Sequence, residues 1–143
     1  MDPIDFVAYG LLPWYPHMGT ADAAIWDRYV RQNPAAFDKA AYDVPVGAGA
    51  PFDTTVNPTT GGNLSKLYRY KIDVVAEKNG ELYVIEVKAR AGPRAIEQVL
   101  GYARLAPLYL PDAKNPKALI VTDSLMPDMG RLAKSAGVEL RVI

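Results

Sequence analysis

The sequence of 143 residues contains no cysteine and a single histidine, His17. The absence of cysteine excludes disulfides, zinc ribbons, iron–sulfur clusters and a cysteine nucleophile. One histidine argues against a multi-histidine metal site and against a Ser–His–Asp triad, so we expect His17 to be structural. Any catalysis by this chain would therefore rest on carboxylates, lysine and a hard metal ion.

The chain also lacks a long apolar stretch and an excess of either charge. No run of 18 apolar residues occurs, and Asp2 stands where a signal peptide would be basic, so we expect a cytoplasmic protein with no membrane partner. The 16 basic and 16 acidic residues cancel. They are unevenly spread, however: residues 1–60 hold seven acids and three bases, and residues 61–143 hold nine acids and 13 bases. Attraction for a polyanion should lie in the second part.

Half of the residues are hydrophobic and 22% are charged, which is typical of a globular protein. We expect one domain over residues 1–143, with an irregular N-terminal arm at residues 1–19, where aromatic residues, proline and glycine are frequent. Residues 47–63 contain four glycines and two prolines and predict a long loop.

Hydrophobic periodicity and turn residues predict the element order α, β, β, β, α, β, α, β. This order favours the α/β class, with a mixed central sheet flanked by helices. Thr20 is the expected N-cap of the first helix, and Pro45 favours an edge position for the first strand. Helices are expected at residues 20–33, 93–106 and 128–136, and strands at 41–46, 67–78, 81–89, 118–121 and 138–143.

The strongest local signal is Asn79-Gly80, which predicts a two-residue hairpin turn. Counted out from this turn, Asp73 faces Glu86 across the hairpin, with Cβ atoms about 4.5–5.5 Å apart. Both acids lie within apolar runs. Two like charges at this distance destabilise a hairpin unless a bound cation or a shared proton offsets them. Stability alone does not select this pair.

Lys88 lies two residues beyond Glu86 and points to the same face. Oxygen ligands without histidine or thiol suit Mg²⁺ or Mn²⁺, which polarise a phosphodiester and activate a bound water. Lys88 could orient or deprotonate that water, or stabilise the developing charge. The same count places Lys71 beside Lys88 and Arg69 beside Arg90, a cationic rim suited to a phosphate backbone. The alternative is an exposed sheet face with salt-bridged acids.

Ile72-Asp73-Val74-Val75, followed by Val84-Ile85-Glu86-Val87-Lys88, resembles the PD-(D/E)xK nuclease superfamily. That superfamily has the restriction-endonuclease-like αβββαβ core. Gln98-Val99-Leu100-Gly101-Tyr102 resembles the QxxxY motif of its RecB-like and lambda-exonuclease-like branch. The resemblance covers about residues 20–123, and it departs from the family at Ile72, where proline is frequent.

The resemblance implies that Asp73 and Glu86 bind the metal, with the Val87 carbonyl as a further ligand and Lys88 as the catalytic lysine. It also implies that Gln98 and Tyr102 support the site or contact DNA. These two residues are four apart and share a helix face.

The first helix of the family often contributes a glutamate to the metal. Here that helix offers Asp22 and Asp27, and we expect Asp27, in mid-helix, to be the ligand. Asp43 is a candidate outer ligand, although a surface position is the simpler expectation.

The sequence thus predicts a Mg²⁺- or Mn²⁺-dependent deoxyribonuclease that hydrolyses DNA phosphodiester bonds. Two alternatives stay open. One is a non-catalytic nuclease-fold module that binds DNA or builds a larger assembly such as a phage virion. The other is a dimeric Holliday-junction-type resolvase. The small size suggests recruitment by a larger assembly or a phage origin, and with it a location in bacterial cytoplasm, host cytoplasm or virion.

Overall fold

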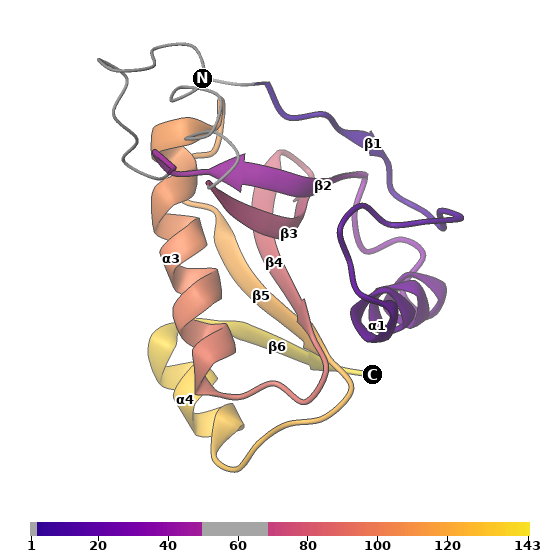
Figure 1. Ribbon diagram of the computed structural model, residues 1–143, viewed down its shortest axis with the longest axis vertical. Helices are drawn as coiled ribbons and strands as arrows, with labels where there is room; N and C mark the ends of the chain where they lie inside the picture. The colour runs from indigo at the N-terminus through magenta and orange to yellow at the C-terminus, as the bar shows by residue number, and fades with distance from the viewer. Residues whose placement is uncertain (1–2, 50–68) are drawn as a thin grey trace, which may run out of the picture.

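The computed structural model describes residues 3–49 and 69–143 of the chain. These residues form one mixed sheet of six strands in the order β1-β2-β3-β4-β5-β6, with helices on both faces (Figure 1). β2, β3 and β4 are antiparallel, whereas β4, β5 and β6 are parallel, so the predicted α/β class with a mixed sheet is confirmed. The elements are β1 (Val7–Ala8), α1 (Thr20–Gln32), β2 (Lys39–Val46), β3 (Tyr70–Lys78), β4 (Glu81–Lys88), α3 (Pro93–Tyr109), β5 (Lys117–Thr122), α4 (Met129–Ala136) and β6 (Glu139–Val142).

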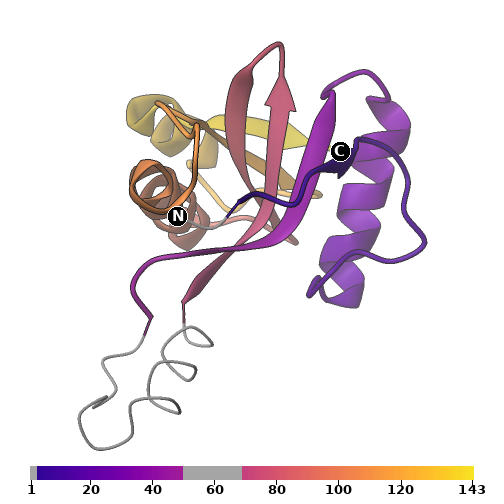
Figure 2. The same cartoon turned by 90° about the horizontal axis from the view of Figure 1, so that it is seen from above.

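The sheet separates two hydrophobic cores (Figure 2). α1 covers one face and buries Trp26 completely against it. α3 and α4 cover the other face, where Val99 of α3 is completely buried. Successive residues of a strand face opposite sides, so Val74 of β3 packs on the α1 side and Val75 on the α3 side.

The β3–β4 hairpin forms as predicted. Asn79 and Gly80 have φ angles of 51° and 81°, the left-handed values that a type I′ turn requires. Lys78 pairs with Glu81, and the ladder continues in this register to Val74 and Ile85. Since a hairpin register follows from its turn, the residues at the far end of the two strands are placed by the Asn-Gly pair.

The ends of the helices differ from the prediction in two places. The N-cap of α1 is Gly19, which makes no side-chain cap, and Thr20 is the first helical residue, so the predicted cap was wrong by one position. α3 continues three residues beyond the predicted end at 106, although Pro107 lies inside it. Burial of Ala106 and Leu110 holds this last turn on the core despite the missing N–H of the proline.

The N-terminal segment contains a short strand that the sequence pattern did not reveal. Val7 and Ala8 of β1 pair with Ala40 and Lys39 of β2. Two residues are too few to show a period-2 pattern. β1 does not extend to Pro45, so this part of β2 has β3 as its only partner strand among the described residues. An edge position suits Pro45, because proline has no backbone N–H to donate to a second strand. Of the predicted 47–63 loop, residues 50–63 lie outside the described residues.

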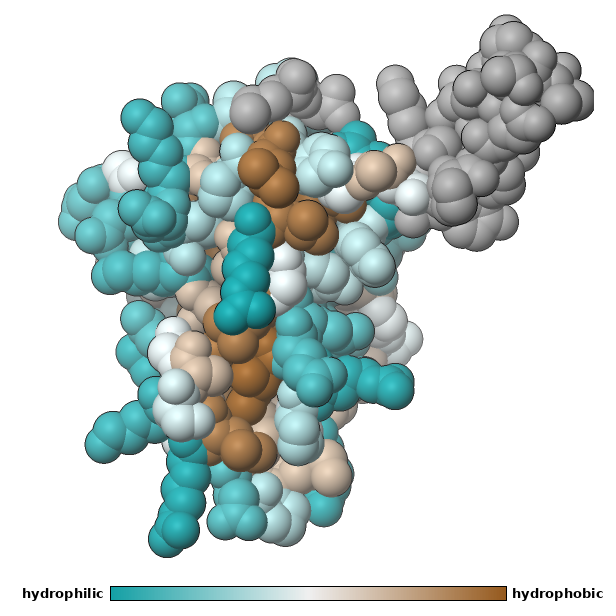
Figure 3. Space-filling model, turned by 90° about the vertical axis from the view of Figure 1, so that its left-hand side faces the viewer, coloured by the Kyte–Doolittle hydropathy of each residue, from teal (hydrophilic) through white to brown (hydrophobic). Residues whose placement is uncertain are grey.

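The α3 side of the molecule carries a strip of apolar side chains between hydrophilic ones (Figure 3). Leu108 of α3 and Leu132 of α4 are exposed large apolar residues. Among the described helices, none has the length and apolar character needed to cross a membrane.

Candidate active site at the carboxylate pair

Asp73 and Glu86 meet where the β3–β4 ladder ends. The last backbone pair is Val74 with Ile85, and Asp73 is the next residue of β3. Its Oδ2 atom accepts a hydrogen bond of 2.9 Å from the backbone N–H of Val87. A side-chain hydrogen bond thus links the two strands just beyond the last backbone pair. The two carboxyl groups lie within hydrogen-bonding reach of each other. The backbone pairing thus ends one residue short of Asp73 and Glu86, whose side chains interact beyond it.

Glu86 is only 8% exposed, and its Oε2 atom is buried without a hydrogen-bond partner among the described residues. A buried carboxylate without a partner lowers the stability of the fold by roughly several kcal/mol unless it binds a proton or a cation. The described residues include no group of three or more His, Cys, Asp or Glu side chains that could hold a metal ion. The pair fits a hard divalent cation that takes its remaining ligands from backbone carbonyls, water or phosphate.

Both carboxyl groups bind protons more tightly than usual. Burial raises the pKa of Asp73 to about 6, although the N–H of Val87 lowers it and the charge of Asp22 raises it further. Burial, followed by the charge of Asp73, raises the pKa of Glu86 to about 8. The two carboxyl groups act on each other directly, so they titrate as a pair.

Lys88 is exposed at the end of β4, directly beyond the pair. Its positive charge lowers the pKa of Glu86, so the ammonium group acts electrostatically on that carboxylate. The neighbouring residue across the parallel ladder is Thr122 of β5, which is completely buried. Lys88 is thus exposed and near enough to Glu86 to act on its charge, and the catalytic role expected of it stays a prediction.

The first turn of α1 also reaches the site, through Asp22. Its Oδ1 atom accepts a hydrogen bond of 3.2 Å from the backbone N–H of Ala89, just after β4. The charge of Asp22 raises the pKa of both Asp73 and Glu86. Asp22 is therefore the acid of α1 whose charge acts on the carboxylate pair.

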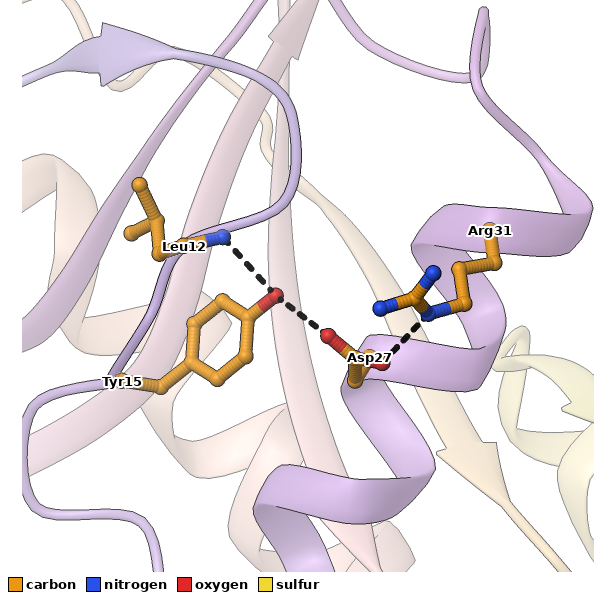
Figure 4. Close-up of polar contacts among 4 residues, drawn as sticks. All are labelled: Leu12, Tyr15, Asp27 and Arg31. Carbon is orange, nitrogen blue, oxygen red and sulfur yellow. Dashed lines mark hydrogen bonds and ion pairs between the residues drawn. The ribbon is translucent and has the colours of Figure 1, made fainter.

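Asp27 makes its hydrogen bonds with the N-terminal arm and with its own helix (Figure 4). Its Oδ1 atom accepts a 3.3 Å hydrogen bond from the Tyr15 hydroxyl, and its Oδ2 atom accepts one of 2.7 Å from Nε of Arg31. Five residues turn a helix by about 140°, so Asp22 and Asp27 point in different directions. The expectation of Asp27 as a metal ligand is corrected on this ground.

Gln98 and Tyr102 of α3 line one open cleft of about 470 Å³, as expected from their spacing. Burial raises the pKa of the Tyr102 hydroxyl, and the charges of Glu86 and Asp73 raise it further. Tyr102 is thus a lining residue of the cleft whose hydroxyl group feels the charges of both carboxylates. The other lining residues are Tyr70, Glu97, Gly101, Arg104 and Leu105.

The cross-strand neighbours predicted for Lys71 and Arg69 do not pair in the β3–β4 ladder, because this ladder ends at Val74 and Ile85. Lys71 pairs with Pro45 of β2, and its Nζ atom lies 4.0 Å from Oδ2 of Asp43. Nε of Arg69 donates a 2.7 Å hydrogen bond to the carbonyl of Gly47. Arg90 adopts a φ of 46° after β4, and its N–H donates to the carboxylate of Asp123.

Two further residues gather beside Asp73. Asp43 has a left-handed φ of 53°, and its charge raises the pKa of Asp73. Nε2 of His17 lies 3.3 Å from Oδ2 of Asp43, so the N-terminal arm reaches this edge of the site. Asp43 was a candidate outer ligand from the sequence, whereas its ion pair with His17 joins segments that are distant along the chain and has no local signal.

The sheet order, with α1 on one face and α3 and α4 on the other, is that of the restriction-endonuclease-like fold. A repair endonuclease from Pyrococcus abyssi superposes with a TM-score of 0.50 over 84% of this chain and 46% of that one, at 22% identity. The EndoMS–dsDNA2 complex superposes with a TM-score of 0.50 over 92% of this chain and 48% of that one, at 18% identity. The chain spans about half the length of these structures. No family model and no curated protein matches its sequence.

Proposed function

We propose that this chain is a metal-dependent nuclease that hydrolyses DNA phosphodiester bonds at the Asp73–Glu86 pair. The observation that carries the proposal is the buried Oε2 atom of Glu86, which has no donor among the described residues and lies beside a second carboxylate. A folded chain keeps such an arrangement at a cost in stability, and a bound cation offsets that cost.

Asp73 and Glu86 would hold Mg²⁺ or Mn²⁺, with the backbone carbonyl of Val87 as a further ligand. The ion would polarise the phosphodiester and lower the pKa of a bound water. Val87 also donates its N–H to Asp73, which orients that carboxylate. Lys88, beyond the pair, would orient the attacking water or stabilise negative charge on the phosphate.

The fold neighbours support DNA as the substrate. One is described as a repair endonuclease, and the other was solved as a complex with dsDNA. Because this chain spans about half of each, the cutting and binding of DNA by this chain are part of the proposal.

The test is a cleavage assay in Mg²⁺ or Mn²⁺ on linear, nicked, single-stranded and branched DNA. We expect metal-dependent cleavage that Glu86→Gln and Lys88→Met abolish. Glu81→Gln is the matched control, because Glu81 lies on the same strand with its carboxylate exposed and paired with Lys117. A wild-type chain that binds Mn²⁺ but cuts none of these substrates would refute the enzymatic function and favour a non-catalytic DNA-binding module.

A further inference from the structure

Tyr70 presents an exposed aromatic ring to the cleft beside the carboxylate pair. It is the first residue of β3, and it is 60% exposed although it lies three residues from Asp73. Its ring centroid lies 5.9 Å from that of Tyr102, with 41° between the ring planes. The two rings belong to different elements and border the same cleft of about 470 Å³.

The end of β2 supports the ring of Tyr70 from one side. Gly47 has a φ of 97°, and a Cβ atom there would lie 3.2 Å from Cδ2 of Tyr70. The absence of a side chain at this position lets the backbone pack against the ring edge. Arg69 fastens this backbone to β3 through its 2.7 Å hydrogen bond to the Gly47 carbonyl. The ring is therefore supported on one side while much of it stays open to solvent.

The chemistry of the cleft fits a nucleobase. Its volume lies within the range of about 300–1,000 Å³ that is typical of ligand sites. Aromatic rings stack on any base, and the amide of Gln98 can both donate and accept a hydrogen bond at a base edge. Arg104 adds a positive charge suited to a neighbouring phosphate, while Glu97 opposes it on the same helix.

The position of Tyr102 relates the cleft to the reaction site. The charges of Glu86 and Asp73 both act on its hydroxyl group. The two rings are too close for a base to enter between them, so a base would stack on the open face of Tyr70, in the cleft that Tyr102 also lines. A base within a duplex is paired and stacked on its neighbours, so only an unpaired base can enter such a cleft.

We infer that Tyr70 and Tyr102 form a stacking site for one unpaired nucleobase, which makes single-stranded or locally unpaired DNA the preferred substrate. This inference rests on the proposed function and specifies its substrate class. Tyr70 acts here as a binding and specificity residue, because it touches the base and not the reacting phosphate.

The test measures binding rather than cleavage. Fluorescence anisotropy would follow a labelled 12-nucleotide single strand and its duplex in chelator at low salt. We expect the wild type to prefer the single strand, Tyr70→Ala to weaken that binding about 5- to 150-fold, and Tyr70→Phe to retain it. Trp14→Ala is the matched control, because Trp14 is 69% exposed but does not line this cleft. Thermal melts would verify that each variant is folded.

A scan with one abasic nucleotide at each position locates the stacked base. Loss of the base at that position should weaken binding of the strand to the wild type. The same loss should not weaken binding to Tyr70→Ala any further. Equal affinity for single strand and duplex, or no effect of Tyr70→Ala, would overturn the inference even if the wild type cleaves DNA. Conversely, Tyr70-dependent single-strand binding by a wild type that cleaves nothing would support the stacking site and refute the nuclease.

Discussion

Replacing Glu86 with glutamine should stabilise the metal-free protein at alkaline pH. The pKa of Glu86 is about 8 in the folded chain, against an ordinary value of 4.5. A tenfold change in proton affinity corresponds to about 1.4 kcal/mol, so the full difference sets an upper limit of about 5 kcal/mol. Because Asp73 and Glu86 titrate as a pair, the gain should be smaller than this limit. We expect Glu86→Gln to raise the free energy of unfolding by about 2–3 kcal/mol at pH 8.5.

The sign of the pH dependence follows from proton binding. Between about pH 4.5 and pH 8 the folded protein holds more protons at Glu86 than the unfolded chain does. The free energy of unfolding of the wild type should therefore fall as pH rises through this interval. In Glu86→Gln this contribution is absent, so the two proteins should differ little at pH 5 and most at pH 8.5.

The assay is thermal unfolding in chelator at pH 5 and pH 8.5, followed by circular dichroism. For a chain of this size, 2–3 kcal/mol corresponds to a rise in Tm of roughly 6–10 °C. Glu81→Gln, on the exposed part of the same strand, should leave Tm nearly unchanged at both pH values. If Glu86→Gln melts at or below the wild-type temperature at pH 8.5, the claim that two buried like charges destabilise the metal-free protein is refuted.

Three further outcomes are expected. Mn²⁺ at 100 times its Kd should stabilise the wild type by about 2.7 kcal/mol, and a melt of Glu86→Gln or Asp73→Asn should show no such gain. Lys88→Met should abolish cleavage while leaving Tm within about 2 °C, since Lys88 is exposed; a large loss of Tm would assign it a structural role. Asp22→Asn should lower the cleavage rate at least tenfold, whereas Asp27→Asn should leave the rate unchanged in the same assay; the reverse order would refute the placement of α1.

The hairpin shows what local sequence can determine. Asn79 and Gly80 adopt left-handed backbone angles that most residues avoid, so the turn forms at one place only. The turn sets the register as far as Val74 and Ile85, and Asp73 and Glu86 are the next residues of the two strands. Apolar runs in β4 and β5 likewise required a buried sheet, because their side chains gain free energy only by leaving water.

The residues around the pair depended on contacts that no local pattern encodes. Asp22 and Asp27 lie on one helix, and only the way α1 docks against the sheet decides which of them reaches Ala89. Asp43 approaches Asp73 across the β2–β3 pairing, which joins residues some 30 positions apart. The ladder also ends at Asp73, because its carboxylate accepts the N–H of Val87, which regular spacing could not anticipate.

The sequence by itself thus determined the order of the described elements from α1 to β6, the hairpin and the closeness of the two carboxylates. These features follow from turn stereochemistry and the alternation of side chains, which act over a few residues. The tertiary structure alone decided that Asp22 joins the site, that the cationic rim is interrupted, and that Tyr70 meets Tyr102 across an open cleft. These features depend on how helices and strands pack, which is the sum of many weak contacts between residues far apart in the chain.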